Sequence, residues 1–281
     1  MRRRTLLRSS LALPALGVSA PALVSCGEDV PVRQPDQPGE GRFAYGEDPS
    51  QFGELYLPTG TPRGVVVVVH GGFWLDEYDY TLGSPMVASL AAEGWAAWNV
   101  EYRRVGNGGG APATFDDVAA GIDHLAELGL DLDRVVTLGH SAGGHLGTWA
   151  AARGREERWP GGVKVTHVIA QAGVLDLVAG DAEDLGGGAV ARFLGRSPAP
   201  GDPGVAVLDP QQQLPLDVPV WCVHGDDDRN VPPSQSAAYV DAATAVGATA
   251  EQVIVEGDHF VLIDPTSAAW ARQLEILDTI G

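Results

Sequence analysis

Short hydrophobic runs along this chain alternate with segments in which apolar residues recur at helical spacing. Val65–Val69 is an unbroken run of β-branched residues, which is typical of a strand covered on both faces. Between residues 114 and 128, Phe115, Val118 and Ile122 fall on one stripe of a helix. Such patterns predict strands at 52–57, 65–69, 96–102, 134–138, 165–170, 219–223 and 252–255, and helices at 84–93, 114–128, 144–151, 234–246 and 266–280. The alternation indicates an α/β fold, with a mostly parallel central sheet and helices on both faces.

Residues 176–216 interrupt this alternation. They contain Gly186-Gly187-Gly188 and many prolines, and they show no clear strand or helix period. A long irregular segment of this kind either covers a functional site as a lid or crosses the surface without a role. The sequence leaves both interpretations open.

The first 26 residues have the pattern of a bacterial export signal. Residues 1–8 are basic, and residues 9–25 are apolar but short for a membrane span. Arg3-Arg4-Thr5-Leu6-Leu7 resembles a twin-arginine signal, with the general secretory route as the alternative. Leu23-Val24-Ser25-Cys26 resembles a lipobox, which predicts a lipid on Cys26; Pro21 disfavours cleavage after Ala20. We therefore expect a protein anchored to the outer face of the cytoplasmic membrane, with secretion without an anchor as the alternative.

Residues 27–41 are rich in proline, glycine and charge, which predicts a flexible tether. Residues 42–281 would then form one domain, and 44% hydrophobic residues in the whole chain suffice for a full core. The formal net charge of −19 makes nucleic acid an unsuitable partner, because phosphate backbones would be repelled. If Cys26 carries lipid, Cys222 has no partner for a disulfide, and its apolar neighbours predict a core position.

Gly139-His140-Ser141-Ala142-Gly143 carries the clearest chemical signal. This G-x-S-x-G segment follows a predicted strand and precedes a predicted helix. Strand, sharp turn and helix with a serine at the turn form a nucleophile elbow, in which the turn exposes the hydroxyl. The context predicts that Ser141 is a catalytic nucleophile.

A serine hydroxyl needs a base to take its proton, and the base needs a carboxylate to fix its tautomer. His259 follows the strand that ends at Val255, where a loop leaves the carboxyl edge of the sheet. His167 lies within a predicted strand, and His224 ends one directly before a glycine turn, so both suit this role less well. We expect His259 to be the base.

The acid should leave the carboxyl end of the preceding strand, where three aspartates stand in a row. Asp228 lies deepest in the turn before the next helix and is the predicted acid. Asp226 and Asp227 are its rivals, and Asp176, after an earlier strand, is a weaker one.

Acyl transfer also needs donors for the developing oxyanion. The N–H of Ala142, at the start of the helix after Ser141, is one candidate. His70-Gly71-Gly72-Phe73-Trp74 follows the strand at 65–69, and its glycines allow the N–H groups of Gly72 and Phe73 to turn inward.

Four motifs, H-G-G-F-W (70–74), G-H-S-A-G-G-H (139–145), H-G-D-D-D-R-N-V-P (224–232) and G-D-H-F (257–260), together resemble the α/β-hydrolase superfamily. They are most similar to its esterase/lipase branch, with kynurenine formamidase-like proteins and feruloyl and acetyl-xylan esterases. The resemblance covers the chain from about residue 52 onward. It implies a serine hydrolase that cleaves carboxylic esters of small or aromatic acyl groups through an acyl-enzyme, with a small ester or an acylated polysaccharide as substrate.

Other functions remain open at this stage. An arylformamidase would use the same machinery, and an oligopeptidase is a further alternative that lacks its usual propeller domain here. A surface-binding protein that has the hydrolase fold without activity is the rival from another class. Motifs for a nucleotide cofactor and ligand spacings for a metal are missing from the sequence, so neither is expected; the sequence does not set the oligomeric state.

The remaining histidines and aromatic residues suggest supporting roles. We expect His70 to brace the oxyanion loop by hydrogen bonding, His140 and His145 to pack in the core, and His124 to be exposed. A final set could either shape an aromatic substrate pocket or pack on itself: Phe73, Trp74, Tyr78 and Tyr80.

Overall fold

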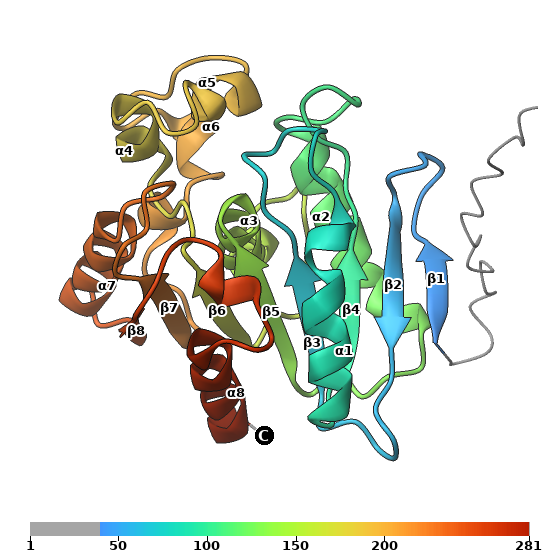
Figure 1. Cartoon of the computed structure of the whole chain (residues 1–281). Coiled ribbons are helices and arrows are strands. Elements are labelled where there is room, and N and C mark those ends of the chain that lie inside the picture. The colour runs from blue at the N-terminus through green and yellow to red at the C-terminus, as the bar shows by residue number, and fades with distance from the viewer. Residues whose placement is uncertain (1–39, 281) are drawn as a thin grey trace, which may run out of the picture. The chain divides into compact units, whose positions relative to one another are not determined.

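An eight-stranded sheet runs through residues 40–280, the part of the chain that the computed structural model describes (Figure 1). The order across the sheet is β1-β2-β4-β3-β5-β6-β7-β8. β2 is antiparallel to both of its neighbours, and the strands from β4 to β8 are parallel. The strands are β1 Gly41–Ala44, β2 Phe52–Tyr56, β3 Val65–Val69, β4 Ala96–Val100, β5 Val135–His140, β6 His167–Gln171, β7 Val220–Gly225 and β8 Ala250–Val255.

The helices pack on both faces of this sheet. They are α1 Ser84–Ala92, α2 Ala113–Asp123, α3 Ala142–Ala150, α4 Leu177–Ala182, α5 Ala189–Leu194, α6 Pro203–Ala206, α7 Ser234–Ala245 and α8 Ala268–Ile280. α1 and α8 contribute to one hydrophobic cluster, and α2, α3 and α7 contribute to the other. No helix within the described range is long and apolar enough to cross a bilayer.

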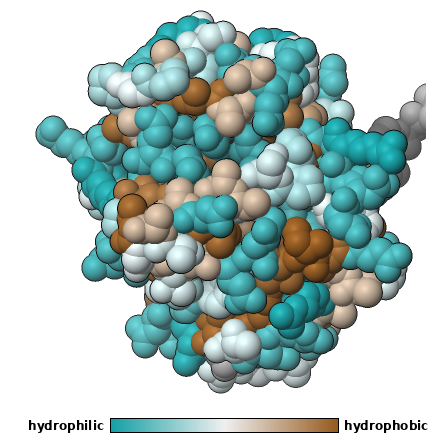
Figure 2. Space-filling model, turned by 90° about the vertical axis from the view of Figure 1, so that its left-hand side faces the viewer, coloured by the Kyte–Doolittle hydropathy of each residue, from teal (hydrophilic) through white to brown (hydrophobic). Residues whose placement is uncertain are grey.

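β3 shows why the sheet needs two helical layers. Its five valines are all fully buried, and they alternate between the clusters: Val65, Val67 and Val69 face one, Val66 and Val68 the other. Burying each valine side chain stabilises the fold by about 1.5–3 kcal/mol. On the face that carries β8 and α7, hydrophilic residues prevail and hydrophobic residues lie in separate patches (Figure 2).

Every predicted strand and helix is present, with shifts at the ends. The helix predicted at 114–128 is divided: α2 ends at Asp123, and a 3₁₀ turn covers His124–Glu127. β1 was not predicted, and its first residue, Gly41, is the last residue of the predicted tether. The predicted export signal, Cys26 and residues 27–39 of the tether lie outside the described residues.

Candidate active site

Ser141 lies at a strained turn between β5 and α3. Its φ of 57° and ψ of −119° are rare for a residue with a side chain, and its N–H donates to Gln171 O at 2.8 Å. A Cβ added at Gly139 would lie 2.1 Å from Gly143 O, and one at Gly143 would lie 2.0 Å from Val69 O. The two glycines are therefore required for the close approach of strand and helix, and the turn has the predicted nucleophile-elbow geometry.

The carboxyl ends of the parallel strands bring the other candidates to the same edge of the sheet. Asp228, in the loop after β7, accepts a hydrogen bond from Nδ1 of His259, in the loop after β8, at 2.6 Å. Both residues are buried, and His259 lines one small pocket together with Ser141. Because Nδ1 is bonded to Asp228, Nε2 is the ring nitrogen that is available to take the proton of the serine hydroxyl.

Asp228 is held by four donors. Oδ1 accepts the N–H groups of Asn230 and Val231 at 2.8 and 2.9 Å, while Oδ2 faces His259 and His224. Burial by itself raises the pKa of this carboxyl, but the hydrogen bonds from His224, His259 and the Val231 N–H outweigh burial and lower the pKa well below its usual range. The carboxylate is therefore ionised when it meets His259.

The rival acids have other partners. Asp226 accepts the N–H of Gly257 at 2.9 Å, and Asp227 pairs with Arg229 on the surface. Asp176 caps α4 by accepting the N–H of Ala179 at 2.8 Å. Of the four aspartates considered, only Asp228 contacts His259.

The loop after β3 turns through three residues with positive φ. These are Gly72, Phe73 and Trp74, at 109°, 50° and 57°. Within the described residues, no protein acceptor pairs with the N–H groups of Gly72, Phe73 or Ala142. Gly72 and Phe73 line the same pocket as Ser141, so their donors are available for an oxyanion there.

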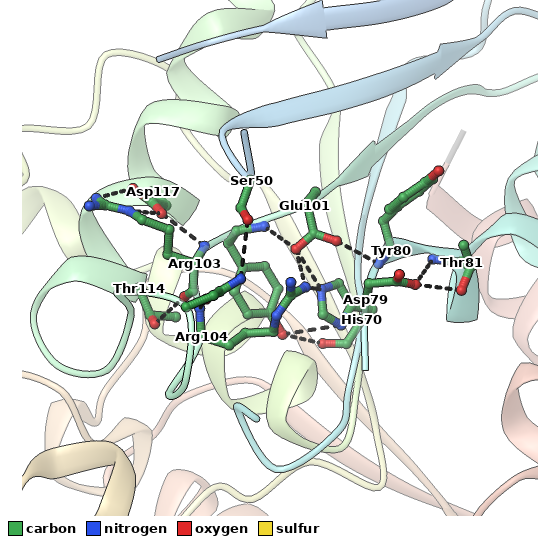
Figure 3. Close-up of polar contacts among 12 residues, drawn as sticks. Ser50, His70, Asp79, Tyr80, Thr81, Glu101, Arg103, Arg104, Thr114 and Asp117 are labelled. Atoms are coloured by element: carbon green, nitrogen blue, oxygen red, sulfur yellow. Dashed lines mark hydrogen bonds and ion pairs between the residues drawn. The ribbon is translucent and has the colours of Figure 1, made fainter. Parts of the chain in front are cut away.

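A buried polar network lies behind this loop (Figure 3). Arg104 pairs with Glu101, and its guanidinium is 3.4 Å from Nε2 of His70. Because a guanidinium only donates, Nε2 accepts, and the proton on Nδ1 is donated to Gly71 O at 2.8 Å. In a planar peptide the N–H points away from the carbonyl, so Gly72 N–H faces the opposite side of the loop. The predicted bracing by His70 is thus present.

Tyr102 and Arg103 complete the network from the adjacent segment. The Tyr102 hydroxyl donates to His70 O at 2.7 Å, and the two rings stack with centroids 4.3 Å apart. The Arg103 side chain makes two hydrogen bonds to the fully buried Asp117, at 2.7 and 2.8 Å. The partners of Arg103 and Arg104 could not be predicted from the sequence, since these contacts depend on how separate elements pack.

The aromatic residues divide between pocket and core. Phe73 and Tyr78 line the pocket, whose volume is about 70 Å³, with Leu82, Phe260 and Ile263. Trp74 is buried and stacks on Phe193 at 4.5 Å. Tyr80 packs against Phe52 with ring centroids 5.1 Å apart, so it is part of a structural contact.

His140 and His145 are packing residues, as predicted. Nε2 of His140 donates to His259 O at 2.9 Å, and Nε2 of His145 donates to Leu208 O at 2.8 Å. Burial lowers the pKa of His140 to about 3 and that of His145 to about 4, so both are neutral. The expectation that His124 is exposed was wrong: the 3₁₀ turn after α2 rotates its ring inward, 6.0 Å from that of Trp98.

Comparison with solved structures identifies the fold. A carbohydrate esterase from gut microbiota matches with a TM-score of 0.71 and 21% identity, over 85% of this chain and 94% of that one. Esterase B from Lactobacillus Rhamnosis matches with a TM-score of 0.72 and 22% identity, over 85% and 83%. The protein has the α/β-hydrolase fold, as the sequence motifs predicted.

The family is narrower than the fold. The sequence profile of the BD-FAE family matches residues 54–242, more than half of the chain, and the protein belongs to this family. Isoprenylcysteine alpha-carbonyl methylesterase ICME of Arabidopsis thaliana is 25% identical over 76% of this chain and 55% of its own length. Esterase LipC of Mycobacterium tuberculosis is 28% identical over 73% and 55%. The chain thus spans about half the length of these relatives.

Proposed function

We propose that this protein hydrolyses carboxylic esters through a serine acyl-enzyme. The observation that carries the proposal is the hydrogen bond from His259 to Asp228, together with the pocket that His259 lines with Ser141. Gly72 and Phe73 line the same pocket, and no acceptor in residues 40–280 pairs with their N–H groups, which supports the proposal. The named relatives are esterases, which agrees with the reaction class.

The reaction begins when Ser141 Oγ attacks the ester carbonyl carbon and His259 Nε2 takes the hydroxyl proton. The carbonyl oxygen becomes an oxyanion, which accepts hydrogen bonds from Gly72, Phe73 and Ala142 N–H. As the bond to the alcohol oxygen breaks, His259 returns the proton to that oxygen. Water then gives a proton to His259 while its oxygen attacks the acyl carbon. As the bond between that carbon and Ser141 Oγ breaks, His259 gives the proton to Oγ, and the carboxylic acid leaves. Asp228 stabilises the imidazolium in both halves.

The pocket favours small acyl groups. Its volume is only about 70 Å³. Five apolar side chains line it, so a short uncharged acyl group fits better than a long or charged one. Esters of small acyl groups, free or attached to a polysaccharide, are the proposed substrates.

The test compares the purified protein with Ser141→Ala on p-nitrophenyl acetate, butyrate and octanoate, acetylated xylan, methyl ferulate and N-formylkynurenine. We expect serine-dependent turnover that falls with acyl length, and a loss of about 10⁶-fold in kcat for the variant. A fluorophosphonate probe should label only the unaltered protein. Preference for N-formylkynurenine would favour an arylformamidase, and absence of both labelling and turnover would favour a surface-binding protein without activity.

We also propose that the protein acts outside the cytoplasm, attached through a lipid on Cys26. The basis is the sequence of residues 1–26 alone. Cys26→Ala should move the protein from the membrane fraction to the soluble fraction of cells, whereas unchanged fractionation would exclude the anchor.

A further inference from the structure

His224 is a fully buried titratable residue that the proposed mechanism does not use. It is the next-to-last residue of β7, four positions before Asp228. The loop that follows, from Gly225 to Val231, curls back over the imidazole. Both ring nitrogens therefore meet polar partners.

These partners determine the tautomer of His224. Nε2 lies 2.9 Å from Val231 O and 3.2 Å from Asp228 Oδ2, while Nδ1 lies 2.7 Å from the hydroxyl of Ser236 in α7. A carbonyl oxygen only accepts, so Nε2 carries a proton, which it shares between the carbonyl and the carboxylate. The Ser236 hydroxyl can donate a hydrogen bond to Nδ1, so both ring nitrogens have partners.

The contact matters because Asp228 Oδ2 is the oxygen that holds His259. The 3.2 Å contact from His224 and the 2.6 Å bond from His259 reach this one atom from two sides. The N–H groups of Asn230 and Val231 hold the other oxygen. Without His224, Oδ2 would lose one of its two donors, and the bond from His259 would be the remaining hydrogen bond that fixes its position.

We propose that His224 is a positioning residue that holds Asp228 Oδ2 in line with Nδ1 of His259. The proposal rests on the proposed ester hydrolysis for its kinetic consequence. It is supported by the lowered pKa of Asp228, to which the His224 hydrogen bond contributes.

The kinetic test uses His224→Leu, which removes both ring nitrogens, and His224→Gln, whose amide N–H can replace Nε2. His145→Leu is the matched control, because the His145 ring is also fully buried, also donates to one carbonyl, and makes no hydrogen bond to Ser141, Asp228 or His259. Active sites are first counted with a fluorophosphonate, so that unfolded protein does not affect the result. We expect kcat per active site for p-nitrophenyl acetate to fall about 10- to 100-fold in His224→Leu, with KM nearly unchanged. In His224→Gln, kcat should recover largely. In His145→Leu, kcat should stay near the wild-type value.

A spectroscopic test does not depend on turnover, and its first measurement needs no variant. In the unaltered protein, long-range ¹⁵N–¹H correlation should show that Nε2 of His224 is protonated and Nδ1 is not. The low-field proton of the His259 Nδ1–H bond, identified by its loss in His259→Gln, should be present in the unaltered protein and in His145→Leu, and shifted or absent in His224→Leu.

Two outcomes would overturn the proposal. One is protonation of Nδ1 with a bare Nε2, since such a ring cannot donate to Asp228. The other is a His224→Leu protein whose kcat per active site and low-field proton both match the unaltered protein. If no serine-dependent turnover exists at all, the proposed function fails, and the tautomer and the low-field proton still decide the role of His224.

Discussion

Asp226 and Asp228 stand two residues apart in one loop and are directed to different partners. Asp226 is tied to the N–H of Gly257, whereas Asp228 faces His259. The difference arises because Asp228 folds under the loop, where His224 and two backbone N–H groups hold it. Proximity in sequence therefore does not make these carboxylates interchangeable.

Asparagine substitutions separate the two roles. Asp228→Asn should lower kcat for p-nitrophenyl acetate by about 10⁴-fold, because an amide no longer fixes the productive tautomer of His259. Asp226→Asn keeps a side-chain oxygen for Gly257 N–H and should retain nearly full activity. Steady-state kinetics after titration of active serines would measure both, and a large loss in Asp226→Asn with little loss in Asp228→Asn would assign the acid to Asp226.

At the level of single residues, the sequence was enough to predict candidates that directly follow a strand. Ser141, His259 and Asp228 could be found because each follows a recognisable strand at the carboxyl edge of a parallel sheet. His224 was set aside as a strand residue, and its contact with Asp228 depends on how the following loop folds back. The prediction that His124 is exposed was wrong for a similar reason, since a helical period does not reveal where α2 changes to a 3₁₀ turn.

The segment of residues 176–216 shows what an element-level pattern can hide. The sequence left open whether this segment is a lid or a surface segment without a role. In the structure, several of its side chains are buried. Phe193 of α5 is buried and stacks on Trp74 of the oxyanion loop. Buried Asp209 accepts the N–H of Leu177 at 3.2 Å, which joins the two ends of the segment. The segment therefore supports the oxyanion loop from outside the sheet.

Gly186 and Gly187 allow this support to be tested with a matched pair. Both have φ near 60°, at 57° and 60°, so alanine at either position costs about 1–2 kcal/mol of backbone strain. An added Cβ at Gly186 would lie 2.7 Å from the ring of Phe73, while nothing lies within 4 Å of one at Gly187. We expect urea unfolding to show loss of stability in both variants, and kcat to fall about 10-fold only in Gly186→Ala, as Phe73 is displaced. Equal activities of the two variants would show that the segment does not influence the loop.

For the whole molecule, the alternation of apolar runs and helical stripes was enough to predict the layers, because burial on two faces leaves a strong pattern. β1 left none: its four residues, Gly41–Ala44, include only one that is buried. The order of the strands could not be predicted either, since it depends on pairings between distant segments such as β3 with β5. The residues of the candidate active site could nevertheless be predicted, because each lies after a strand whose direction could be predicted.

Buried neutral histidines should make the whole molecule less stable in mild acid. Burial lowers the pKa of His145 to about 4, against about 6.5 for an unfolded chain. Between these values the unfolded state binds more protons than the folded state, so stability is unaffected above pH 6.5 and falls as pH decreases toward 4. At pH 5 this histidine alone should cost about 2 kcal/mol relative to pH 8.

His145→Gln isolates this effect, because the glutamine amide can still donate to Leu208 O but does not titrate. The free energy of unfolding in urea, measured at pH 8 and pH 5, should fall by about 2 kcal/mol less in the variant than in the unaltered protein. Contributions from the carboxylates and from His140 are present in both proteins and cancel in the difference, because they lie outside the substituted site. An identical pH dependence in the two proteins would mean that His145 is charged in the folded state at pH 5, in spite of its burial among Trp74, Phe115 and Phe193.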